Sequence, residues 1–218
     1  MKLKYKGVIF DLDGTLVDTL DDIAASMNRA LKTRGFPEHP AENYKSKVGW
    51  GIKRLALLSL PEGARSEKTA ALVAADAAIF YAEAPLVHSR PYPGILDIIS
   101  ALKQKNVKTA VLTNKPDPVA QKVISGLFPP FSFEEVLGER EGMKRKPDPS
   151  STWELIVGMG ITPRDTIFVG DSEIDMETAL AASCHALGVS WGYRPLEVLE
   201  KAGAQRIIHK PGELLEIL

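Results

Sequence analysis

Two aspartates stand directly after a short apolar run near the start of the chain. Asp11 and Asp13 follow the run Gly7–Phe10, and Gly14 permits a tight turn behind them. Two carboxylates this close repel each other unless a cation or a shared proton lies between them. A hard divalent ion such as Mg²⁺ suits oxygen ligands of this kind. The pair therefore indicates either a metal-assisted site or a turn whose aspartates cap the next helix.

The apolar run before these aspartates belongs to a series that is typical of buried parallel strands. Such strands are rich in Val, Ile, Leu or Phe and end at polar or turn-forming residues. Helical patterns separate them, and this alternation predicts an α/β fold, a doubly wound parallel sheet with a Rossmann-like core. Ligands of such sheets bind at the carboxyl ends of the strands, where Asp11 and Asp13 stand. The predicted strands are Gly7–Phe10, Val107–Leu112, Glu135–Leu137, Thr166–Val169, His185–Val189 and Arg206–Ile208, and the helices between them are Ile95–Lys105, Pro118–Leu127 and Met176–Ser183.

The stretch between the first two strands breaks the alternation. It is helical in pattern at Asp21–Arg34, Gly51–Leu60 and Ser66–Glu83, with no convincing strand. Prolines in the segment Arg90–Gly94 disfavour a continuing helix, so we expect the chain to return to the core there. The prediction is an inserted α-helical cap at residues 18–90, with the core formed by residues 1–17 and 91–218.

The overall composition excludes several classes of protein. The 218 residues carry a formal net charge of −1 without long blocks of one sign, so we expect neither a nucleic acid nor a membrane surface as partner. The single cysteine, Cys184, cannot form an internal disulfide, and its apolar surroundings favour a buried core thiol over a nucleophile. The N-terminal apolar run is too short for a signal peptide, so we expect a cytoplasmic protein. We make no prediction of oligomeric state.

Four segments in order resemble the signatures of the haloacid dehalogenase-like hydrolases. The first is Asp11–Asp18, which reads Asp-Leu-Asp-Gly-Thr-Leu-Val-Asp, and the second is Val111–Lys115. The third is Lys146–Pro149, and the fourth, Val169–Asp175, contains Gly-Asp-Ser-Glu-Ile-Asp. Each motif alone is only moderately specific, whereas four in order at predicted strand ends are very specific. The resemblance spans nearly the whole chain and implies a Mg²⁺-dependent phosphoryl-transfer enzyme.

The resemblance also implies a role for each catalytic residue. Asp11 would be the nucleophile that forms an aspartyl-phosphate, and Asp13 would be the general acid and then the general base. Thr113 and the backbone N–H of Asn114 would bind phosphate oxygens. Lys146 would hold Asp11 and the phosphate together.

The same resemblance implies a set of metal ligands. Asp11, the backbone carbonyl of Asp13 and Asp171 would bind Mg²⁺, and Asp175 would bind it or orient Lys146. Each group also has a purely structural interpretation. Asp171 and Asp175 could cap a helix, and Lys146 could be a solvated charge like its neighbour Lys144.

A glycine-rich segment in the predicted cap is the candidate for contacts with the rest of the substrate. Gly49 and Gly51 flank Trp50 and would let the loop approach a ligand closely. Gly51 and Lys53 stand where a helix begins, and helix N-termini bind anions. Lys53, or its basic neighbours Lys47 and Arg54, could then meet a substrate carboxylate. The alternative is that Trp50 packs in the cap and the basic residues are solvated.

The branch of the family decides the expected substrate. The segments Val48–Gly51 and Asp171–Asp175 are similar to those of the phosphoglycolate phosphatase branch. We therefore expect a phosphatase for a small phosphorylated metabolite, 2-phosphoglycolate first. The alternatives are another small phosphoester, pyrophosphate, a phosphotransferase like β-phosphoglucomutase, or a binding protein without turnover. The mutase usually has an acidic residue where Gly170 stands, which favours hydrolysis.

Overall fold

A six-stranded, fully parallel sheet forms the centre of the molecule in the computed structural model, which describes residues 4–218. Its strand order is β5-β4-β1-β6-β7-β8, so β1 lies between β4 and β6. The order reverses at β1, which creates the crevice where ligands of doubly wound sheets bind. The strands are β1 (Gly7–Phe10), β4 (Lys108–Pro116), β5 (Glu135–Glu139), β6 (Thr166–Gly170), β7 (His185–Val189) and β8 (Arg206–Ile208).

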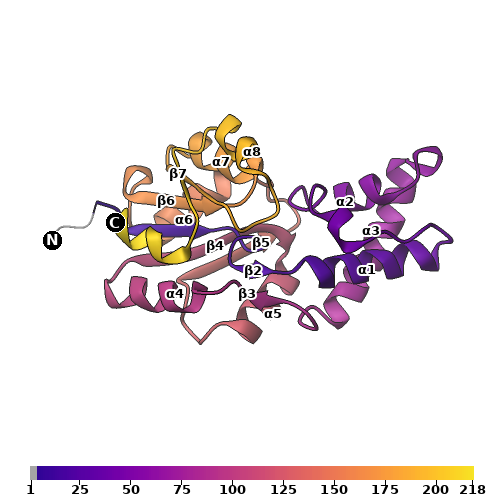
Figure 1. The fold of residues 1–218 in the computed structure, drawn as a ribbon, viewed down its shortest axis with the longest axis horizontal. Coiled ribbons are helices and arrows are strands. Elements are labelled where there is room, and N and C mark those ends of the chain that lie inside the picture. The colour runs from indigo at the N-terminus through magenta and orange to yellow at the C-terminus, as the bar shows by residue number, and fades with distance from the viewer. Residues whose placement is uncertain (1–3) are drawn as a thin grey trace.

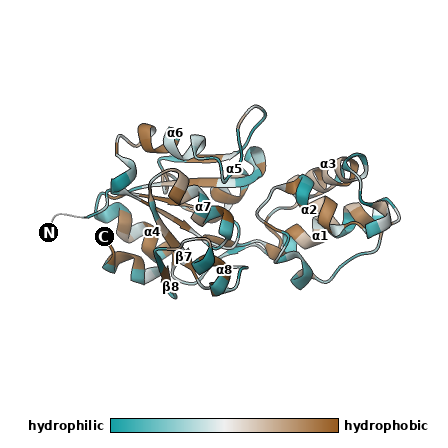
Figure 2. Ribbon diagram, turned by 90° about the horizontal axis from the view of Figure 1, so that it is seen from above, coloured by the Kyte–Doolittle hydropathy of each residue, from teal (hydrophilic) through white to brown (hydrophobic). Residues whose placement is uncertain are grey.

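Helices cover both faces of this sheet (Figure 1). Val8 and Phe10 of β1 pack in one apolar cluster with α4 and α5, whereas Ile9 packs in the other cluster with α6, α7 and α8. This alternation follows from the two-residue period of a strand. Hydrophobic residues accordingly line the central strands in Figure 2. The helices are α4 (Ile95–Gln104), α5 (Asp117–Leu127), α6 (Ser150–Gly158), α7 (Glu173–Ala181) and α8 (Leu196–Lys201), with 3₁₀ helices at Pro163–Asp165 and Pro211–Glu216.

Three further helices form a bundle beyond one end of the sheet (Figure 1). They are α1 (Leu20–Thr33), α2 (Ile52–Ser59) and α3 (Glu67–Glu83), with 3₁₀ helices at Ala41–Tyr44 and Glu62–Ala64. The chain leaves and re-enters the core through a two-stranded antiparallel ribbon, β2 (Val17–Asp18) and β3 (Arg90–Pro91). We call this bundle the cap. The two segments that connect the cap to the core lie side by side in the ribbon. The cap lies beyond the end of the sheet where the core strands have their carboxyl ends (Figure 1).

The predicted α/β class and parallel sheet are confirmed, and several element boundaries differ. β4 continues past the predicted end at Leu112 to Pro116. The prediction stopped early because Thr113–Lys115 are polar, as loop residues usually are, although the structure buries them. α6 and α8 were not predicted. Cys184 is buried, and its burial raises the pKa of the thiol to about 12, as expected of a core cysteine.

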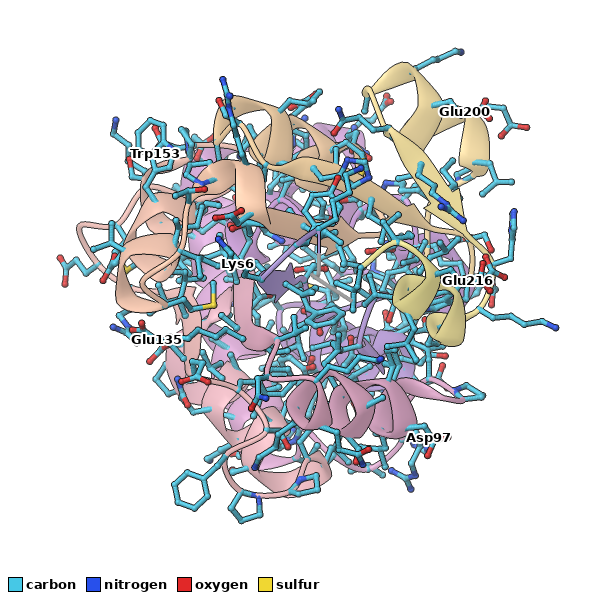
Figure 3. The ribbon with its side chains drawn as sticks, turned by 90° about the vertical axis from the view of Figure 1, so that its left-hand side faces the viewer. Lys6, Asp97, Glu135, Trp153, Glu200 and Glu216 are labelled. Carbon is cyan, nitrogen blue, oxygen red and sulfur yellow. The ribbon has the colours of Figure 1, made fainter. Side chains whose placement is uncertain are left out.

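The end of the core opposite the cap carries charged residues on its rim. In Figure 3, which views the core from this end, Asp97 of α4 and Glu200 of α8 point outward at the periphery, and Trp153 extends from α6. The termini also meet here, with the backbone N–H of Lys4 donating to the carbonyl of Leu218 at 2.6 Å. Within residues 4–218, no helix combines the length and hydropathy needed to cross a membrane.

Candidate active site

The carboxyl ends of three neighbouring strands bring the predicted residues together. Phe10 at the end of β1 is level with Val111 of β4 and with Val169 of β6. Asp11 therefore emerges between the segment that carries Thr113 and the segment that carries Asp171. Both side chains line the same pocket as Asp11. Three segments that are far apart in the sequence thus form one site because the sheet aligns their ends.

Three buried carboxylates lie together at this site, and two of them, those of Asp11 and Asp171, line the pocket. Oxygens of Asp11, Asp171 and Asp175 lie within 4.8 Å of one another, close enough to share one metal ion. The Nζ of Lys146 lies 2.6 Å from Oδ1 of Asp11 and 2.6 Å from Oδ1 of Asp175. One ammonium group cannot neutralise three carboxylates. The cluster fits an additional cation, which oxygen ligands of this kind bind well.

Electrostatics within the cluster lead to the same conclusion. Burial raises the pKa of Asp11 well above its usual value; Lys146 opposes this, and the charges of Asp175 and Asp171 add to it. Burial, with the charge of Asp175, raises the pKa of Asp171 to about 7. Burial lowers the pKa of Lys146, but the charges of Asp11 and Asp175 outweigh it and raise that pKa above the usual range. A further positive charge is needed to keep all three carboxylates ionised.

The carboxylates are held by neighbouring backbone and by glycines. Oδ2 of Asp171 accepts a hydrogen bond of 2.7 Å from the backbone N–H of Tyr193. Oδ2 of Asp175 accepts from the N–H of Ser172 at 3.1 Å and from its hydroxyl at 2.6 Å, which caps α7. A Cβ atom on Gly170 would collide with Asp175, and one on Gly192 would collide with Asp171. Asp175 therefore combines a helix-capping role with a place in the cluster, whereas Asp171 is held by the backbone N–H of Tyr193.

The carboxylate of Asp13 contacts other residues than that of Asp11 does. Its Oδ1 accepts hydrogen bonds from the hydroxyl of Thr19 at 2.6 Å and from the Nζ of Lys115 at 2.5 Å. Asp13 lines the pocket, but its carboxylate lies outside the three-carboxylate cluster. The predicted metal contact of Asp13 concerns its backbone carbonyl and stays a prediction. Thr19 and Lys115 were not singled out from the sequence, although Lys115 directly follows the predicted Thr113 and Asn114.

Asn114 connects the lysine to the cap. Its Oδ1 accepts from the backbone N–H of Lys146 at 2.9 Å, and its Nδ2 donates to the Lys146 carbonyl at 3.1 Å. The same Nδ2 donates to the carbonyl of Gly49 in the cap at 2.9 Å. The hydroxyl of Thr113 accepts from the backbone N–H of Lys115 at 3.2 Å, and its proton remains available to a ligand.

Comparison with known proteins agrees with this geometry. The family model described as haloacid dehalogenase-like hydrolase matches residues 8–189. The chain belongs to this family. The phosphoglycolate phosphatase of Haemophilus influenzae (strain 86-028NP) is 32% identical over 225 residues, with 100% of both chains covered. That of Mannheimia succiniciproducens is 34% identical and covers 88% of this chain and 89% of its own. A Lactobacillus delbrueckii subsp. bulgaricus crystal structure, 33% identical, superposes with a TM-score of 0.93 and covers 99% of each chain.

The cap loop of this haloacid dehalogenase-like hydrolase contributes two predicted residues to the pocket. Gly49 and Gly51 line it, with positive φ angles of 113° and 83° that favour glycine. Trp50 between them is 37% exposed, and its Nε1 donates to Oε1 of Glu173 at 3.2 Å. Lys53 is exposed on α2 and is not among the residues that line the pocket. A basic group that faces the pocket therefore has to be sought among other residues.

A buried arginine from the core holds this cap loop. Arg194 follows β7 and donates from Nη2 to the carbonyl of Val48 at 2.7 Å and from Nη1 to the carbonyl of Lys45. Its Nε donates to Glu173 at 3.0 Å, the residue that also accepts from Trp50. Arg194 was missed at the sequence level. Its position just beyond the carboxyl end of a predicted strand was the available signal.

Proposed function

We propose that this chain is a Mg²⁺-dependent phosphatase that hydrolyses 2-phosphoglycolate through an aspartyl-phosphate on Asp11. The observation that carries the proposal is the contact of 2.6 Å between the Asp11 carboxylate and Lys146 inside a buried carboxylate cluster. Phosphoryl transfer requires positive charge beside the nucleophile, because the transferred group is itself strongly negative, and Lys146 supplies part of that charge. The relatives named phosphoglycolate phosphatase support the choice of substrate.

The cluster provides the ligands for the metal ion. Asp11, Asp171 and Asp175 offer carboxylate oxygens, and Asp13 would add its backbone carbonyl. When bound, Mg²⁺ would neutralise charge on the carboxylates and on the phosphate oxygens. Side chains of the protein would carry out the bond-making, bond-breaking and proton-transfer steps.

Asp11 and Lys146 would carry out the first half of the reaction. Among the described residues, Oδ1 of Asp11 bonds to Lys146, and Oδ2 makes no protein hydrogen bond, which leaves Oδ2 for attack on phosphorus. The Lys146 ammonium and the Thr113 hydroxyl would hold the phosphate oxygens. The bond from Asp11 to phosphorus forms as the bond from phosphorus to the ester oxygen breaks.

Asp13 would move the protons. Protonated Asp13 would give its proton to the departing ester oxygen, so that glycolate leaves as the alcohol. The resulting carboxylate, held by Thr19 and Lys115, would then take a proton from the water that attacks the aspartyl-phosphate. Inorganic phosphate leaves, Asp11 is regenerated and Asp13 is protonated again.

Gly170 favours hydrolysis over the mutase alternative. A Cβ atom at this position would collide with the side chain of Asp175. The acidic residue that the mutase branch usually has there therefore does not fit this arrangement. The substrate class, a small phosphorylated metabolite, also agrees with a pocket that lies between core and cap and is lined by both. The cytoplasmic location stays a prediction.

Phosphate release across a panel of substrates tests the proposal. The panel contains 2-phosphoglycolate, a hexose 1-phosphate, pyrophosphate and an aryl phosphate, each measured with Mg²⁺ and with a chelator. We expect the highest kcat/KM for 2-phosphoglycolate, only with Mg²⁺, and a loss of at least about a thousandfold in Asp11→Asn. Asp97→Asn, at an exposed position, is the matched control. Metal-independent release, or full activity in Asp11→Asn, would refute the proposal.

A further inference from the structure

The ammonium group of Lys115 has unused hydrogen-bonding capacity inside the pocket. Its side chain is 2% exposed, and among the described residues its Nζ makes one hydrogen bond, to Asp13. An ammonium group carries three N–H donors, so two are left without a protein acceptor. Its Nζ also lies 4.5 Å from the centre of the Tyr81 ring. A buried cation with spare donors indicates a ligand that supplies acceptors.

The hydroxyl of Tyr81 is a second unused group at the same place. Tyr81 comes from α3 of the cap, lines the pocket and is 5% exposed. In the described part of the chain its hydroxyl has no hydrogen-bond partner. The neighbouring hydroxyl of Thr19 donates its proton to Asp13. Burial raises the pKa of Tyr81 well above its usual value, so the phenol keeps its proton and can donate it.

The remainder of the pocket offers no competing receptor for an anion. The cap side is otherwise largely apolar, and the hydroxyl of Ser26 on that side donates to the carbonyl of Ile23. The other two cations that line the pocket are engaged. Lys146 lies between Asp11 and Asp175 and its remaining donor is assigned to the phosphate, and Arg194 binds Glu173 and cap carbonyls. The apolar cap side chains are Ile23, Met27, Val48, Ile52, Leu55 and Ala77.

We infer that Lys115 and Tyr81 form the subsite that receives the carboxylate of the substrate. The inference rests on the proposed function and names the residues that select its substrate. In 2-phosphoglycolate one carbon separates the carboxylate from the ester oxygen, and Asp13 protonates that oxygen. A cation that touches Asp13 is therefore within reach of the carboxylate. The contact of 2.5 Å between Lys115 and Asp13 meets this condition, whereas Lys53 is exposed on α2 and does not line the pocket.

The test compares two substrates that differ only at the carboxylate. Ethyl phosphate replaces the carboxylate of 2-phosphoglycolate by a methyl group. The measured quantity is the ratio of kcat/KM for 2-phosphoglycolate to that for ethyl phosphate. We expect this ratio to fall at least about tenfold in Tyr81→Phe, which removes one hydroxyl, and further in Lys115→Met, which removes the charge. The ratio separates carboxylate recognition from the support that Lys115 gives Asp13, because loss of that support lowers both rates.

Two matched substitutions serve as controls. Tyr5→Phe removes a hydroxyl from a buried tyrosine beside His185, and Lys108→Met removes, from an exposed residue at the far end of β4, an ammonium that donates to the carbonyl of Met159. Both are expected to keep the wild-type ratio. An unchanged ratio in Tyr81→Phe and in Lys115→Met would overturn the subsite while the proposed phosphatase stands. A wild-type protein without activity on either substrate would instead overturn the proposed function, and the subsite with it.

Discussion

Removal of the metal should make the stability of this protein fall as the pH rises. The reason is Asp171, whose pKa burial and the charge of Asp175 raise from 3.8 to about 7. The unfolded chain binds this proton only below about pH 4, whereas the metal-free folded chain holds it up to about pH 7. The folded state thus binds more protons in this window. The contribution of Asp171 to stability is complete below pH 4 and is lost as the pH rises through 7.

The size of the effect follows from the two pKa values. Each unit of difference corresponds to about 1.4 kcal/mol, and most of the interval between 3.8 and about 7 lies between pH 5 and pH 8. The free energy of unfolding should therefore fall by about 2–3 kcal/mol between these pH values when no metal is present. For a chain of this size that is about 5–10 °C in Tm. A bound divalent cation should remove the effect, because it favours the ionised carboxylate in the folded state.

Thermal denaturation at pH 5 and pH 8, with chelator and with Mg²⁺, measures this effect. Asp171→Asn cannot titrate, so the difference in Tm between wild type and variant measures the contribution of Asp171 together with its effect on the neighbouring Asp11. In chelator, we expect the difference in Tm between wild type and Asp171→Asn to change by about 5–10 °C from pH 5 to pH 8. The difference in Tm between wild type and Asp97→Asn should change little over the same pH range. Parallel Tm curves for wild type and Asp171→Asn in chelator would refute the reasoning about the cluster.

Three further substitutions test how the site is held together. Gly192→Ala places a Cβ atom against Asp171, so the Mg²⁺ concentration for half-maximal activity should rise at least about tenfold, which a metal titration measures. Arg194→Met removes the hydrogen bonds to the cap loop and should raise both KM and the rate of proteolysis between Lys45 and Trp50. Trp50→Ala should raise KM for 2-phosphoglycolate more than it lowers activity on an aryl phosphate, and equal losses on both would contradict a cap role.

The sequence predicted the core well where one physical signal dominates. Strands buried on both faces read as continuous apolar runs, and β1 and β7 have the predicted boundaries. The edge strand β8 also has the predicted boundaries. The prediction failed where burial and polarity coincide. The last residues of β4 are buried because they face the site, yet their polar types are typical of a loop. α6 begins with Ser-Ser-Thr, which hides its helical pattern.

Some residues of the candidate site could be predicted from the sequence and others could not. Residues in contiguous motifs, such as Asp11 and Lys146, could be proposed from the sequence, and the structure brings them within 2.6 Å of each other. Arg194 and Tyr81 could not be proposed from the sequence, because each acts through a contact between the cap and the core. Arg194 contacts a carbonyl 146 positions away in the sequence, and no local pattern encodes such a contact.

The contacts of Asn114 suggest how closure of the cap and assembly of the site are linked. One side chain binds both backbone groups of Lys146 and the carbonyl of Gly49 in the cap loop. Opening the cap would remove one of these hydrogen bonds and would also carry Tyr81 away from Lys115. Lys146, the proposed phosphate-binding lysine, would stay in place, since two of the bonds of Asn114 lie within the core. An open cap would therefore keep the proposed phosphate site and lose the proposed carboxylate site, so we expect closure to be the step at which a substrate with the correct acid group is distinguished from other phosphate esters.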